Sequence, residues 1–148
     1  MGREFPEIVN FGTAFRFALE MEAACGDLAA AAIVLAPDDG WHDRLEMLVC
    51  THDDRVQKLT TVRQEVNEMI LEPLQGLDGS RYTDVVADEP ATRWPDIVGQ
   101  LAQAEDDTAR FHEDFVAHAE DVLAASARAF KRAAKQDRQA AEELRAAL

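Results

Sequence analysis

Apolar residues recur three or four positions apart along most of the chain, which is the period of an amphipathic helix. The first such stretch predicts a helix over about residues 6–36, opening at a proline that suits the first helical turn. A Pro-Asp-Asp-Gly turn follows, and Asp38 or Asp39 is expected to cap a second helix over about 41–72. We expect this helix to end before Pro73, because the residue preceding a proline avoids helical backbone geometry.

The helical pattern is lost over residues 73–94, where several glycines and prolines predict a loop with room for a short helical turn. Two further helices are expected over about 95–119 and 122–147. The break between them is placed at Glu120-Asp121, with Asp121 as the cap, although neither a glycine nor a proline marks it. One continuous helix from residue 95 to the end of the chain is the alternative.

The loop lengths predict how the helices are arranged. A short turn makes consecutive helices antiparallel, whereas the 22 residues of 73–94 would reach up to about 73 Å when extended. The second helix is about 45 Å long at 1.5 Å per residue, so the loop is able to run its whole length. We therefore predict an all-α fold with one domain over residues 1–148. It is an up-down four-helix bundle in which two antiparallel hairpins are joined by a long crossover loop.

The charge of the chain narrows the choice of partners. Its formal net charge is −14, whereas proteins that bind nucleic acids or anionic membranes usually carry a basic face, so neither is an expected partner. The longest apolar run, residues 28–36, is far shorter than the about 20 residues of a membrane span. The first residues also lack the apolar stretch of a signal peptide. We expect a soluble, cytoplasmic protein that forms a homo-oligomer, such as a dimer, or that binds another protein.

Polar residues interrupt the apolar inner stripes at similar depths in the four predicted helices. These residues are Glu22, His52, Glu105, His112 and Asp137. Glu22 and His52 lie at similar distances on either side of the first predicted turn, and Glu105 and Asp137 do so around the second. In a bundle these four residues would meet near the middle, with His112 one or two turns away. Carboxylates and imidazoles bind divalent metal ions, so we identify all five residues as candidate metal ligands.

Other interpretations of the same residues stay open. The acids could lie at helix edges and face solvent or a basic side chain, and either histidine could be an ordinary core residue. If the acids are buried together, a cation must accompany them: a metal ion, Arg55 or a histidinium. Cys25 and Cys50 are either a redox-sensitive pair or two small buried thiols.

Three segments have a pattern that is known from other helical proteins. Residues 17–22 read Phe-Ala-Leu-Glu-Met-Glu, residues 48–59 read Leu-Val-Cys-Thr-His-Asp-Asp-Arg-Val-Gln-Lys-Leu, and residues 133–144 read Ala-Ala-Lys-Gln-Asp-Arg-Gln-Ala-Ala-Glu-Glu-Leu. Each resembles a ligand-bearing helix segment of the ferritin-like superfamily, especially its rubrerythrin-like branch. The resemblance covers nearly the whole chain. It implies a ferritin-like fold and a site for two metal ions built from two Glu and two Glu-x-x-His motifs.

The metal motifs of that family are reduced in this chain. In one register, His52 and Arg55 stand where the family has Glu and His; in the other, Glu20 and Asp53 are the acids and a valine replaces the histidine. The motif in the fourth helix has Asp137 but no histidine. The resemblance therefore implies a reduced site for iron, manganese or zinc, with a role in metal handling or oxidative-stress chemistry, rather than an ordinary ferroxidase or peroxidase centre.

Two other classes of function compete with metal binding. The chain could be a metal-free helical bundle that serves as a scaffold, an oligomerisation module or a partner-binding module, because a fold does not by itself imply a function. It could also carry a small ligand between its two hairpins. The lost motif histidines favour a metal-free bundle, and the acids at matching depth favour a metal site.

Overall fold

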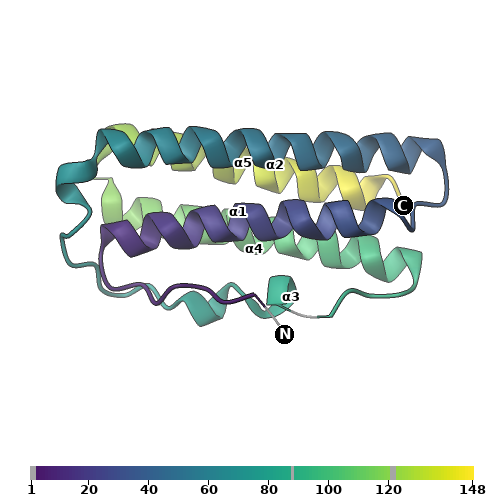
Figure 1. The fold of residues 1–148 in the computed structure, drawn as a ribbon, viewed down its shortest axis with the longest axis horizontal. Coiled ribbons are helices and arrows are strands. Elements are labelled where there is room, and N and C mark those ends of the chain that lie inside the picture. Colours follow the sequence, from purple (N-terminus) through teal and green to yellow (C-terminus); the bar gives the residue numbers. More distant parts are fainter. Residues whose placement is uncertain (1–2, 88, 121–122) are drawn as a thin grey trace.

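A computed structural model describes residues 3–87, 89–120 and 123–148, and within these ranges the fold is all-α, as predicted. Four long helices lie side by side: α1 (Phe11–Ile33), α2 (Asp39–Glu65), α4 (Trp94–Ala119) and α5 (Ala124–Ala146) (Figure 1). The connection between α2 and α4 contains three short elements, the 3-10 helices η1 (Asn67–Met69) and η2 (Gly79–Arg81) and the single-turn helix α3 (Asp84–Ala87). No strand forms in the described ranges.

The direction of each helix is visible in Figure 1. The chain turns back between α1 and α2 and again between α4 and α5, so each pair is antiparallel. The connection after α2 runs back along the molecule, and α4 therefore starts at the same end as α2. The result is two helical hairpins joined by one long crossing segment.

The start of α1 differs from the prediction. The helix begins at Phe11 and not near Pro6, and it ends at Ile33 and not at residue 36. Asn10 caps it: the Asn10 side chain accepts a hydrogen bond from the Thr13 backbone N–H (2.8 Å), and the Thr13 hydroxyl accepts one from the Asn10 N–H (3.1 Å). Because the preceding residues pair with the backbone of the crossing segment, including Leu74 N–H to Val9 O (3.0 Å), they stay extended.

The end of α2 also differs from the prediction. Of the two candidate caps, Asp38 is the one that accepts a hydrogen bond from the Trp41 N–H (2.9 Å). The helix ends at Glu65, well before residue 72, and a 3-10 turn follows it. The carbonyl of Ile70 accepts from Gly12 N–H (2.8 Å), so this part of the chain hydrogen-bonds the start of α1 instead of continuing α2. Pro73 is therefore not what ends the helix.

The second hairpin agrees more closely with the prediction. α4 begins one residue before the expected start and ends at Ala119, as expected. α5 begins at Ala124, so one continuous helix to the end of the chain is wrong. The predicted cap, Asp121, lies outside the described residues. No described helix is long and apolar enough to cross a membrane.

The core consists of two hydrophobic clusters, one toward each end of the bundle. The first contains the phenylalanines, whose rings contact one another, as Phe15 and Phe115 do with Phe130 at centroid distances of 5.3 and 4.7 Å. The second contains smaller residues such as Val98 and Leu144. Between these two clusters, all four long helices contribute buried polar side chains.

Candidate functional site

The five side chains that the sequence analysis identified meet in one buried cluster. Each of them, Glu22 on α1, His52 on α2, Glu105 and His112 on α4 and Asp137 on α5, is at most 1% exposed. They occupy positions of the inner stripes that apolar residues hold elsewhere, so the packing of the four helices brings them together. The interpretation that the acids face solvent is wrong.

Glu22 lies at the centre of this cluster. Its Oε1 accepts hydrogen bonds from Arg55 Nη1 (2.8 Å) and His52 Nδ1 (3.2 Å), and its Oε2 lies 3.3 Å from His112 Nε2. Burial would raise the pKa of Glu22, but the two histidines and Arg55 hold it well below its ordinary value. The carboxylate is therefore ionised.

His52 connects two carboxylates. Its Nδ1 faces Glu22, and its Nε2 lies 2.5 Å from Glu105 Oε1. Burial would lower the pKa of His52, but the charges of Glu105 and Glu22 raise it well above the ordinary value. A ring with a carboxylate at each nitrogen is best satisfied as a histidinium, in which both nitrogens donate.

Arg55 supplies a permanent positive charge inside the bundle. Its Nη1 donates to Asp137 Oδ1 as well as to Glu22, and its Nη2 donates to Gln136 Oε1 (3.0 Å). Arg55 is one of the three cations that the sequence offers to balance the acids, but it is not among the five predicted ligands. Its position three residues after His52 places both side chains on one helix face.

Asp137 and His112 form the second part of the cluster. His112 Nε2 lies 3.5 Å from Asp137 Oδ2. Burial would lower the pKa of His112, but Asp137 and Glu22 raise it to about 9. Burial and the negative charge of Glu22 raise the pKa of Asp137 well above its ordinary value.

Two buried groups of side chains have the spacing of metal ligands, and a third group, His42, Asp43 and Glu46, is exposed. One donor atom from each of Glu22, His112 and Asp137 lies within 4.8 Å of the others, and Asp137 Oδ2 has no hydrogen-bond partner. Cys25, His52 and Glu105 form a second group with the same spacing. Glu105 Oε2 is also buried without a hydrogen-bond partner. Two carboxylate oxygens of the cluster are therefore without a hydrogen-bond partner and are available to a metal ion.

Cys25 is a further contributor that is not among the predicted ligands. It lies three residues after Glu22 on the same face of α1, which is the signal that could have identified it. Its Sγ is 3.2 Å from Thr108 Oγ1, and burial with the nearby Glu105 raises the pKa of the thiol well above its ordinary value. Both cysteines are free, and Cys50 is exposed, so the interpretation as two buried thiols holds for Cys25 alone.

The alternative register of the family motif does not face the core. Glu20 is partly exposed and pairs with Arg3 (2.9 Å), and Asp53 is exposed on α2. The register with Glu22 and His52 is therefore the one that faces inward.

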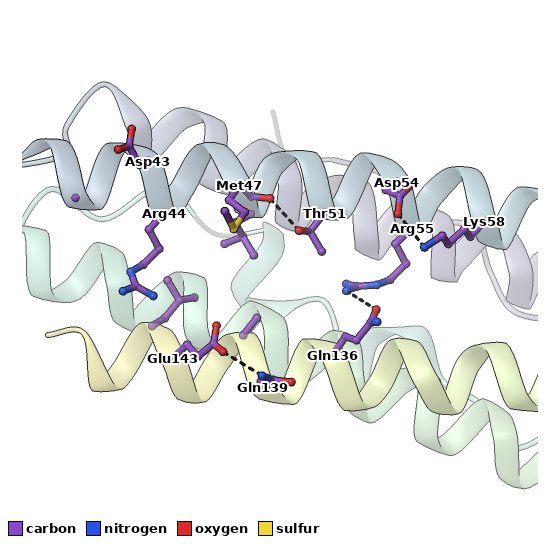
Figure 2. Close-up of a pocket in the computed structure, with 14 residues that line it drawn as sticks. Asp43, Arg44, Met47, Thr51, Asp54, Arg55, Lys58, Gln136, Gln139 and Glu143 are labelled. Carbon is purple, nitrogen blue, oxygen red and sulfur yellow. Dashed lines mark hydrogen bonds and ion pairs between the residues drawn. The ribbon is translucent and has the colours of Figure 1, made fainter.

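The cluster lies behind a groove between α2 and α5. The groove has a volume of about 620 Å³, and Arg55 and Gln136 are part of its wall (Figure 2). Arg55 is the one member of the cluster that lines this groove. Its guanidinium therefore separates the buried carboxylates from solvent on this side.

The chain matches no protein-family model, no curated protein and no solved structure.

Proposed function

We propose that the buried cluster binds one divalent transition-metal ion, held by Glu22, His112 and Asp137, in a divergent ferritin-like bundle. The observation that carries this proposal is the convergence of three donor atoms from three helices within 4.8 Å, one of which, Asp137 Oδ2, has no hydrogen-bond partner. Two carboxylates and an imidazole suit iron, manganese or zinc. Metal handling is the corresponding cellular role.

The arrangement of the helices supports the ferritin-like part of the proposal. Two antiparallel hairpins joined by a crossing connection are the topology in which that superfamily builds metal sites from inward-facing carboxylates and histidines. Here too, every long helix contributes to the cluster.

The charges of the cluster fit one ion better than two. Glu22, Glu105 and Asp137 carry three negative charges when ionised, and Arg55 offsets one of them. Without an ion, protons on the two histidines offset the remaining two charges. One divalent ion that displaces both protons offsets them equally well, whereas a second ion would leave the buried site strongly positive. The pair of ions that the resemblance implies therefore does not fit. Once bound, the ion would supply Lewis acidity or redox chemistry, and this chain's residues would hold it and exclude water.

A metal-free bundle is the second candidate function, and a specific observation favours it. Arg55 bridges Glu22 and Asp137, and two histidinium rings would complete the charge balance without any ion. Such a polar core would serve only to hold the hairpins together. The protein would then act as a scaffold, for example as a homodimer.

Calorimetric titration of metal-free, full-length protein tests the proposal. Mn²⁺, Zn²⁺ and anaerobic Fe²⁺ are the probes. We expect saturation at one ion per chain for at least one of them, and loss of binding in Asp137→Asn. Asp53→Asn, the same change at an exposed position of α2, is the matched control and should bind as the wild type does. Absence of binding by all three ions would favour the scaffold, and sedimentation would then give its oligomeric state.

A further inference from the structure

The groove between α2 and α5 has the size of a small-molecule site. Its volume of about 620 Å³ lies within the 300–1,000 Å³ that is typical of ligand pockets. It lies between the two hairpins and is open to solvent, and Arg44 and Arg55 both reach from α2 toward α5 (Figure 2).

The guanidinium of Arg55 presents an incompletely used edge in this groove. Its Nη1 is bound to Glu22 and Asp137, and its Nη2 donates to Gln136. Its Nε is buried and has no hydrogen-bond partner, and the side chain as a whole is 7% exposed. Nε and Nη2 form one planar edge that matches the two oxygens of a carboxylate. The Gln136 amide oxygen accepts from Nη2 only and leaves Nε without a partner.

The remainder of the groove determines what kind of acid would fit. Part of its wall is apolar and consists of Met47, Leu48, Ala140 and Leu144. The remainder is charged, with the acids Asp43, Asp54 and Glu143 beside Arg44 and Lys58, so an added negative charge is tolerated only at Arg55. The buried carboxylates behind Arg55 disfavour a ligand with two negative charges at that point. A single carboxylate on a short apolar chain meets both conditions.

We propose that the α2–α5 groove binds a small organic monocarboxylic acid. Its carboxylate replaces the Gln136 amide on the Nε–Nη2 edge of Arg55, and its apolar chain lies against Met47, Leu48 and Ala140. This site differs from the metal site, and it requires no metal ion.

Titration calorimetry of chelator-treated, full-length protein with octanoate tests this assignment. Octanoate should bind saturably at one molecule per chain, and 1-octanol, which lacks the carboxylate, should bind at least about tenfold more weakly. Across the series from butanoate to octanoate, affinity should rise about two- to fourfold per methylene. Equal affinity for octanoate and 1-octanol would overturn the role of Arg55.

Two variants on α5 form a matched pair. Gln136→Glu places a carboxylate of the protein itself on the Arg55 edge and should weaken octanoate binding at least about tenfold. Gln139→Glu adds the same charge to the groove one turn away, where Gln139 contacts Glu143 instead, and should change the affinity by less than about threefold.

A third variant tests the apolar part of the groove. Ala140→Trp places a bulky side chain in the groove and should abolish binding. Circular dichroism establishes that each variant is folded. Undetectable binding of octanoate to the wild type, or equal binding by Gln136→Glu and Gln139→Glu, would overturn the proposal. Because the protein is metal-free throughout, these results are independent of whether the metal site exists.

Discussion

Glu22 is the residue on which the buried cluster depends most, because three donors from two other helices meet its carboxylate. Removing one partner of a buried ionic group leaves the others desolvated and uncompensated. The charge of Glu22 therefore matters more to stability than its volume does.

Glu22→Gln preserves the shape of that side chain and removes its charge. We expect the free energy of unfolding to fall by about 3–5 kcal/mol, because Arg55, His52 and His112 each lose an ionic partner. Urea unfolding measures the change. Glu20→Gln is the control on the same helix; its surface ion pair with Arg3 should contribute less than about 1 kcal/mol. Similar losses in the two variants would show that the cluster is not ionic.

The buried histidines predict how stability depends on pH. His112 has a pKa of about 9 in the folded protein, above the about 6.5 of an unfolded chain, and the pKa of His52 is also raised. The stabilisation is therefore complete below about pH 6.5 and is lost as the pH rises toward 9, with His112 alone contributing about 3 kcal/mol. Urea midpoints at a series of pH values measure this decline. His112→Phe should flatten it, whereas His42→Gln, at an exposed position, should not.

Sequence patterns were able to identify the residues of the cluster but not all of its interactions. Glu22, His52, Glu105, His112 and Asp137 stand out because each interrupts an apolar stripe. Arg55 does not, since a long basic side chain normally reaches solvent and only the packed helices show that it turns inward. Cys25 is apolar enough to pass as an ordinary core residue.

At the scale of elements, the crossing segment and the start of α1 support each other. Backbone hydrogen bonds join Gly12 to Ile70 and Leu74 to Val9. Helix periodicity cannot reveal these contacts, because they join residues about 60 positions apart in the chain. For this reason the predicted bounds are wrong at the start of α1 and at the end of α2. Those of α4, which has a proline in its first turn, and of α5 are nearly right.

Gly76 in the crossing segment gives a prediction at this scale. Its φ is +92°, and a Cβ there would lie 3.0 Å from His118 Nε2. Gly76→Ala should therefore destabilise the protein by about 1–2 kcal/mol. Gly99→Ala, inside α4 where a Cβ meets nothing within 4 Å, should instead stabilise it by about 0.5–1 kcal/mol. Thermal unfolding measures whether each variant is more or less stable than the wild type. A change in the same direction in both variants would contradict this description of the segment.

For the whole molecule, the cluster joins one hairpin to the other. His52 contacts Glu105, which is 53 positions away in the chain, and Arg55 contacts Asp137, which is 82 positions away. Both of these long-range contacts depend on the charges of the cluster. The all-α class followed from composition and periodicity, whereas the way the hairpins are held together depends on these distant pairs. An ion bound in the cluster would stabilise both hairpins at once.

Metal binding should therefore raise the melting temperature of the entire protein in a single transition. At a free ion concentration of about 100 times the dissociation constant, the gain is about 2.7 kcal/mol, or about 5–10 °C. Differential scanning calorimetry with and without the ion measures the shift. Asp137→Asn should show no shift, and a shift of equal size in that variant would locate the ion elsewhere.

The most direct test of the proposed function is the number of metal ions per chain. The protein is purified without a metal-binding tag from cells supplied with iron, manganese and zinc, and its content is measured by elemental analysis. One equivalent of a single transition metal, lost in Asp137→Asn and retained in Asp53→Asn, is the predicted result. No bound metal, or two equivalents per chain, would contradict a single ion held by Glu22, His112 and Asp137.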